Sequence, residues 1–125
     1  MNALENRLNL HRRHCEERQR YLAELESLAQ RLRADGGRLR CEIERAVTVG
    51  NPASTPPLLE RHGKLARTLA AIESQITAAD DALAAAVREL KRQELAAAQR
   101  ADNDATFAAR RASRSSRARA ATCGC

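Results

Sequence analysis

Three side chains near the N-terminus have the types and spacing of metal ligands. His11, His14 and Cys15 stand at i, i+3 and i+4, so a helix would place them on one face. Zn²⁺ accepts imidazole and thiolate ligands, but a closed site needs a fourth ligand. None is evident in the region expected to lie opposite, which is the arginine-rich end. We therefore expect solvated side chains and a small packing residue here, and no metal site.

Two further groups could do chemistry, Cys123-Gly124-Cys125 and Asp80-Asp81. Two thiols can bind a soft metal or form a redox pair, but a tail without fixed geometry seldom does either. The adjacent aspartates would diverge by about 100° on a helix and cannot act as a catalytic pair. The sequence also lacks a Walker lysine loop, GxGxxG, a nucleophile elbow and HExxH. We expect no catalytic or cofactor-binding residue, and we predict that the protein is not an enzyme.

A stripe of apolar residues shows what kind of element carries these side chains. Spacings of three and four residues alternate through Leu65, Leu69, Ile72, Ile76, Ala79, Leu83, Ala86 and Leu90. This pattern is the a/d seam of a coiled coil. Because the stripe is too narrow to enclose a globular core, it needs another helix lying along it.

A second seam runs through the N-terminal part of the chain. With Leu8 as position a, ten of the thirteen a and d positions are apolar when Cys and Ala are counted. The exceptions are His11, Arg18 and Gly36. The pair Gly36-Gly37 weakens a helix, because each Gly costs about 1 kcal/mol relative to Ala. Since Leu32 and Leu39 stay seven residues apart across the pair, we predict one helix with a weak point.

Three prolines and a glycine within residues 50–57 must end the first helix. The sequence therefore predicts a helix over residues 2–47, a loop over 48–57 and a helix over 58–112. Joined by one short loop, these would form an all-α, antiparallel two-helix coiled coil, an αα-hairpin over residues 1–112. Residues 113–125 are predicted to be a disordered, Arg-rich basic tail.

Composition favours long helices over a compact core. Aromatic residues are 2% of the chain and charged residues 30%, whereas a compact core would contain several rings. No apolar run reaches the roughly 20 residues that span a membrane. The N-terminus has no apolar region typical of a signal peptide, so we expect a cytoplasmic protein with reduced thiols.

Positive charge concentrates at the C-terminal end. The chain has a net charge of +6, and residues 105–125 contain five arginines and no acid. Such an end could neutralise phosphates or dock on an acidic protein surface. Because interleaved aromatics and known nucleic-acid-binding motifs are missing, we do not expect nucleic acid to be the main partner.

The layout resembles the FliJ family of the type III export apparatus and the YscO-type stalk proteins of injectisomes. The resemblance covers about residues 4–115. It rests on the heptad-bearing helix LENRLNLHRRHCEERQRYLAELESLAQRL, a short Gly/Pro loop and L-x3-L-x2-I-x3-I starting at Leu65. RELKRQELAAAQR and an Arg-rich end follow. The chain departs from the family in lacking an aromatic residue after the loop, in its glycine pair and in its CGC end.

This resemblance implies a non-enzymatic central stalk and export chaperone, in either a flagellar or an injectisome system. Its partners would be a hexameric export ATPase, the cytoplasmic domain of the export gate protein and export chaperones. It would then lie in the cytoplasm, peripheral to the inner membrane at the export apparatus. The alternative is a basic coiled coil that binds nucleic acid or serves as a generic scaffold.

We assign the residues expected to contact these partners from their positions along the predicted rod. The paired helix ends would enter the ATPase ring, and the loop end would face the gate. Expected ring contacts are Arg7, Arg12, Arg13, Arg100, Arg110 and Arg111. Expected gate contacts are Leu58, Leu59, Leu65 and Leu69.

Overall fold

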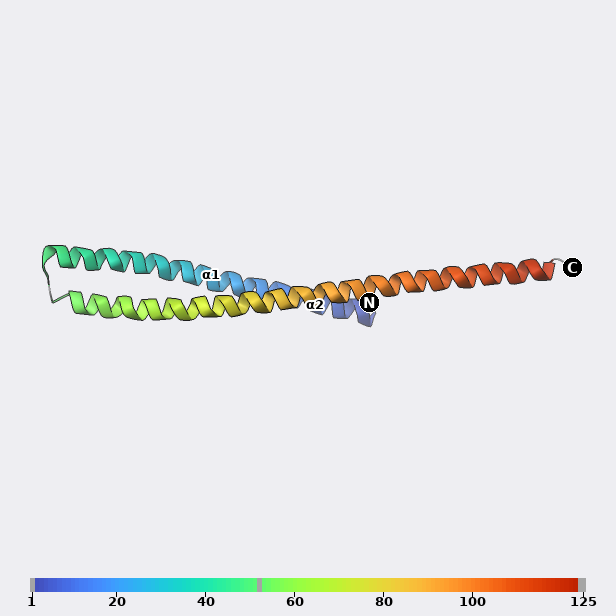
Figure 1. The fold of residues 1–125 in the computed structure, drawn as a ribbon, viewed down its shortest axis with the longest axis horizontal. Helices are drawn as coiled ribbons and strands as arrows, with labels where there is room; N and C mark the ends of the chain where they lie inside the picture. The colour runs from blue at the N-terminus through green and yellow to red at the C-terminus, as the bar shows by residue number, and fades with distance from the viewer. Residues whose placement is uncertain (1, 52, 124–125) are drawn as a thin grey trace.

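The described residues of the computed structural model form two helices that pack against each other. The backbone is described for residues 2–51 and 53–123, and side chains are described as far as residue 117. Helix α1 spans Ala3–Val49 and α2 spans Thr55–Cys123. The two lie side by side along α1, and the chain turns back between them at one end (Figure 1). The all-helical hairpin expected from the sequence is confirmed.

Capping interactions fix both ends of α1. At the N-terminus, Asn2 Oδ1 accepts a hydrogen bond of 2.8 Å from the Glu5 N–H, which would otherwise have no partner. At the C-terminus, Gly50 has φ 72°, a left-handed conformation that glycine adopts without steric cost. The Asn51 N–H then donates to the Ala46 carbonyl at 3.1 Å, as in a Schellman motif. These contacts carry α1 two residues past the predicted end at residue 47.

Helix α2 begins three residues earlier than predicted, at Thr55 instead of Leu58. Pro56 and Pro57 therefore lie in its first turn. The first N–H groups of a helix have no intrahelical acceptor, so a proline loses nothing there. The connection shortens to residues 50–54, which turns α2 directly back along α1.

Helix α2 also runs much farther than residue 112, to Cys123. The predicted disordered tail over residues 113–125 is not confirmed, because its described part is helical. Alanine and arginine, both good helix formers, make up much of this segment and favour continuation of the helix. Residues 124–125 of the predicted tail lie outside the described residues.

The core is the narrow strip between the two helices. All thirteen predicted seam positions of α1 and all eight of α2 are buried or half-buried. The buried residues are Cys15, Leu25, Ala29, Leu39 and Ala79. Within the described part of the chain, neither helix is long and apolar enough to cross a membrane.

Candidate functional site

The turn end of the hairpin exposes large apolar side chains. Val47, Val49 and Leu59 are 63%, 75% and 53% exposed. Val47 and Pro56 line an open hollow of about 480 Å³, and Val49 lines a second hollow. Val47 and Val49 are two residues apart on α1 and diverge by about 200°, so these side chains surround the end of the rod instead of forming one flat patch. We call Val47, Val49, Pro56 and Leu59 the apolar tip.

Sequence reasoning missed the valines of the apolar tip. Residues 48–57 were assigned to a loop, so Val49 was not placed on a helix. The available signal was a pair of β-branched apolar residues at a helix end, outside the heptad seam. Of the four leucines predicted at this end, Leu59 is exposed and Leu58 is half-buried.

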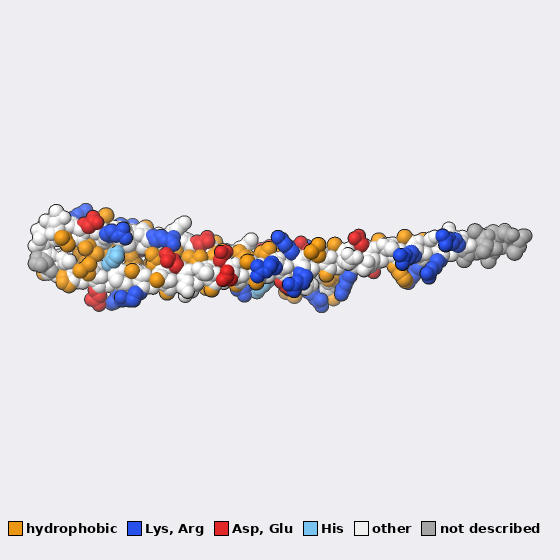
Figure 2. Space-filling view, viewed as in Figure 1, with side chains coloured by type: hydrophobic (Ala, Val, Ile, Leu, Met, Phe, Trp, Pro, Cys, Tyr) orange, Lys and Arg blue, Asp and Glu red, His pale blue; other side chains and the backbone are white. Residues whose placement is uncertain are grey.

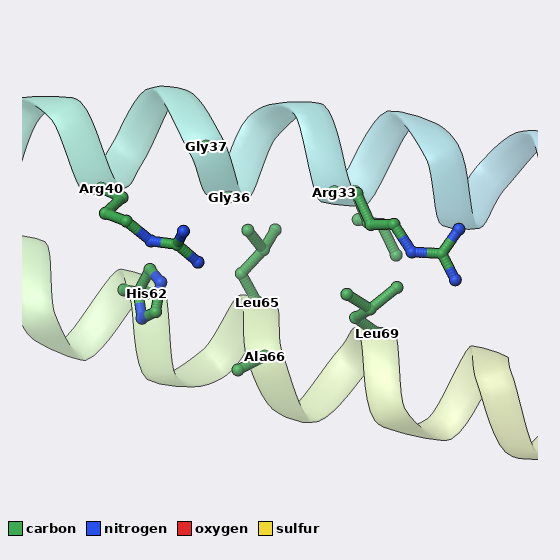
Figure 3. A pocket seen from close by; sticks show the side chains of 9 residues that line it. Arg33, Gly36, Gly37, Arg40, His62, Leu65, Ala66 and Leu69 are labelled. Carbon is green, nitrogen blue, oxygen red and sulfur yellow. The ribbon is translucent and has the colours of Figure 1, made fainter.

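Leu65 and Leu69, the other two predicted gate contacts, point toward α1 (Figure 3). Both are half-buried. A Cβ atom built on Gly36 would lie 3.1 Å from Leu65 Cδ2, so the leucine occupies the space that a larger residue would need. Their packing therefore lies between the helices, and the exposed surface of the tip is formed by other residues.

The glycine pair of α1 has two different environments. The helix continues through Gly36 and Gly37. The close approach of Leu65 accounts for Gly36, whereas a Cβ on Gly37 would meet nothing within 4 Å. Gly37 also has no positive φ, since Gly50 alone has one among the described glycines. Internal packing therefore does not explain why position 37 carries a residue that costs a helix about 1 kcal/mol.

A groove of about 260 Å³ opens between the helices at this point. Leucines from both helices, including Leu65 and Leu69, form its apolar floor. Gly36 and Gly37 form part of the α1 side. Arg33 stands at one end of the groove, and Arg40 stands with His62 at the other (Figure 3).

Two exposed ion pairs between the helices show how the helices are aligned along their length. Arg33 Nη2 lies 3.1 Å from Glu73 Oε1, and Arg12 Nε lies 3.9 Å from Glu94 Oε1. Arg12 precedes Arg33 by 21 residues, and Glu94 follows Glu73 by 21 residues. The alignment of the two helices is thus constant over three heptads.

The predicted ring contacts divide into two groups. All six arginines are exposed. The Arg12–Glu94 alignment places the start of α1 beside the region of Arg100, so Arg7, Arg12 and Arg13 lie near it. Arg110 and Arg111 lie ten or more residues beyond, about 15 Å farther along α2. The last two therefore stand on a part of α2 that α1 does not reach.

Beyond the start of α1, α2 continues as a lone helix. Every side chain from residue 98 to 117 is exposed, and blue basic side chains recur along this segment (Figure 2). Arg110, Arg114 and Arg117 follow one another at i, i+4 and i+7, so they form one stripe. The Arg111 guanidinium lies 4.9 Å from the Phe107 ring centroid, a cation–π contact. We call residues 98–117 the lone helix.

The three possible metal ligands near the N-terminus lie in different environments. Cys15 is buried in the seam and His11 is half-buried, whereas His14 is exposed. His14 Nε2 accepts a hydrogen bond from Arg18 Nε at 3.2 Å. The part of the chain that the structure describes contains no group of three His, Cys, Asp or Glu side chains able to hold a metal ion. The side chains of the CGC end lie outside the described residues.

One carboxylate near the start of α1 has a shifted pKa. The Gln93 amide donates a hydrogen bond of 3.0 Å to Glu89 Oε1, which favours the ionised form and lowers the Glu89 pKa. The charges of Arg92 and His11 lower this pKa further. Only the smallest of these contributions, from His11, comes from α1.

Comparison of the chain with protein-family models, curated proteins and solved structures finds no match. One end carries the apolar tip, and the other carries the basic lone helix, on which Phe107 is also 60% exposed. The two ends differ in chemistry and lie far apart on one rod (Figure 2).

Proposed function

We propose that this chain is a non-enzymatic central stalk and export chaperone of a type III secretion system. It links a hexameric export ATPase to the cytoplasmic domain of an export gate protein. The observation that carries the proposal is the chemical difference between the two ends of the rod, since only the lone helix carries a stripe of arginines without acids beside it. The resemblance to FliJ and YscO-type proteins supplies the identity of the two partners.

The shaft of this stalk is an antiparallel coiled coil. Its two seams follow the 3-4 spacing, and all their positions are buried or half-buried. In that heptad frame, Arg12, Arg33, Glu73 and Glu94 all occupy e positions, where interhelical ion pairs form. A pairing within one chain predicts a monomer of 13.8 kDa by light scattering, whereas pairing between chains would double that mass.

The lone helix enters the ATPase ring. Its outer arginines, Arg110, Arg111, Arg114 and Arg117, have no α1 beside them and can face an acidic pore wall in more than one direction. Complementary charge accelerates association and fixes orientation more than it adds affinity. Binding at this end therefore weakens as the salt concentration rises.

The apolar tip meets the export gate. Val47, Val49 and Leu59 would lose their exposed apolar surface on binding, which favours association. A small set of central apolar residues often supplies most of the binding energy of an interface. Burial of three such side chains makes this end less sensitive to salt than the lone helix.

Titration into the purified hexameric export ATPase tests the ring contact. We expect co-elution and faster ATP hydrolysis, and we expect Arg110→Glu with Arg111→Glu to weaken binding about tenfold or more. Arg20→Glu with Arg31→Glu is the matched control, because both residues are exposed on α1 and the net charge changes equally. Wild-type protein that neither binds nor stimulates the ATPase would refute the proposal.

Binding to the soluble cytoplasmic domain of the gate tests the other end. Val47→Ser with Val49→Ser removes apolar surface from the tip without changing charge. We expect this variant to lose gate binding and keep ATPase binding. Tyr21→Ser, at a surface aromatic residue that is 48% exposed on α1, should keep both. Loss of ATPase binding instead would show that the two ends are assigned the wrong way round.

The Arg110, Arg114 and Arg117 stripe favours a second candidate function, binding of nucleic acid through phosphates. Under this alternative the chain would shift duplex DNA in a gel at about 0.2 M salt, where weak phosphate contacts are largely lost. It would also leave the ATPase unaffected. That combination would replace the stalk with a nucleic-acid-binding coiled coil.

A further inference from the structure

We propose that the groove at Gly36 and Gly37 is a docking site for an acidic segment of a partner protein. The occupant is a peptide that carries a bulky apolar side chain next to a carboxylate. The apolar side chain enters the groove, and the carboxylate binds between Arg40 and His62. This inference does not depend on the stalk function, since it uses neither the apolar tip nor the lone helix.

The groove has room for a side chain and a backbone that permits close approach. Leu65 and Leu69 rise from α2 to form its floor (Figure 3). At Gly37 the α1 backbone has no Cβ atom, and the space that a Cβ would fill is open. Glycine is the residue that lets a backbone come close to a ligand. A contact with a partner at this point explains a glycine that internal packing does not require.

One end of the groove has positive charge that the chain itself does not neutralise. Arg40 and His62 come from opposite helices and point toward one another (Figure 3). Among the described side chains, neither residue takes part in an ion pair. An anion bound there would pair with the Arg40 guanidinium and accept a hydrogen bond from a ring N–H of His62.

The other charged groups nearby do not supply that anion. Arg33, at the opposite end, is already paired with Glu73. Asp35 lies on α1 toward the far side of the seam, where it pairs with Arg38. Glu44 lies one turn beyond Arg40 and forms no ion pair among the described side chains.

The leucine floor and the charged end of the groove together indicate which class of ligand fits it. A free phosphate would use Arg40 and His62 and leave the leucine floor exposed. An apolar peptide without acid would cover the floor and leave Arg40 unpaired. An acidic peptide with one apolar side chain satisfies both, since burial of apolar surface and a pair of opposite charges each favour binding.

Nuclear magnetic resonance titration tests the site with a defined probe, the acetylated tripeptide amide Glu-Leu-Glu. We expect the Gly36 and Gly37 amide signals to shift with a dissociation constant of about 1 mM, as befits a short peptide on a shallow groove. The peptides Gln-Leu-Gln and Glu-Ala-Glu, which lack the acid and the bulky side chain, should each bind at least about fivefold more weakly. Equal shifts with all three peptides would overturn the proposal.

Variants locate the binding to this groove. Arg40→Gln removes one cation, and Gly37→Leu fills the open space, so each should weaken Glu-Leu-Glu at least about fivefold. Gly63→Ala is the matched control, because it also replaces a helix glycine and its Cβ would make only an ordinary contact with Arg67. Absence of shifts at Gly36 and Gly37 up to about 10 mM peptide would refute the site. Unchanged binding in both groove variants would do the same.

Discussion

Replacing each residue of the glycine pair by alanine tests the alignment of the helices. Gly37→Ala should raise the free energy of unfolding by about 1 kcal/mol, the difference in helix propensity, because the new methyl group meets nothing. Gly36→Ala has the same propensity gain, but its Cβ would lie 3.1 Å from Leu65 Cδ2. Moving Leu65 off its preferred rotamer costs about 0.5–1.5 kcal/mol. The net change at position 36 should therefore be close to zero.

Urea unfolding followed by circular dichroism measures this difference. With a urea dependence of about 1–2 kcal/mol per molar, the midpoint of Gly37→Ala should exceed that of Gly36→Ala by about 0.5 M or more. The control Gly63→Ala should behave like Gly37→Ala. Equal stabilisation at positions 36 and 37 would show that Leu65 does not pack against Gly36. Destabilisation by Gly37→Ala would show that α1 is not a regular helix there.

Further expectations concern the seam, the thiols and one carboxylate. Leu25→Ala should lower the free energy of unfolding by about 2–3 kcal/mol, measured in urea, because Leu25 is only 7% exposed and its loss leaves a cavity. Cys41 is exposed and should react with a thiol reagent at once, whereas buried Cys15 should react only as the hairpin opens. Gln93→Ala should raise the Glu89 pKa toward its ordinary value, as read by nuclear magnetic resonance, because the hydrogen bond that favours the carboxylate is lost. Since the folded pKa lies below 4.5, Glu89 contributes stability above that pH and loses it as the pH falls through the folded pKa.

Controls make each of these outcomes specific. Tyr21→Ala, at an exposed position, should change stability much less than Leu25→Ala, and an equal loss would contradict the seam. The thiol experiment uses Cys123→Ser with Cys125→Ser, so that only Cys15 and Cys41 are counted. Equal rates for these two thiols would contradict the packing of α1 on α2. A Glu89 pKa unchanged by Gln93→Ala would contradict the assigned hydrogen bond.

Heptad spacing was sufficient to predict the seam of this fold. Every predicted a and d position is buried or half-buried, including the misfits His11, Arg18 and Gly36. The reason is physical, since a 3-4 apolar period puts one stripe along a helix and only a second helix can cover it. Gly36 illustrates the limit of this reasoning, because nothing in its own segment shows that Leu65 would fill the space above it.

Helix ends and surfaces were predicted less well. The prolines at 56 and 57 were assigned to the loop, although a first helical turn accepts them. The arginine-rich end was predicted to be disordered from its polarity, yet its alanines and arginines also favour helix. The apolar tip and the groove combine residues from both helices, so their recognition requires the alignment as well as the pattern.

The lone helix owes its conformation to the hairpin behind it. A short isolated helix is marginal in water, because its first turn is costly to form. Here that first turn already exists, since α2 is continuous from the hairpin into residues 98–117. The lone helix therefore needs only to be extended from existing turns. We expect its amide hydrogen exchange to become faster with distance from Ala97. A partner that binds the outer arginines would slow exchange along the whole segment. The hairpin would then supply the first turns of the helix, and the partner would stabilise its outer turns.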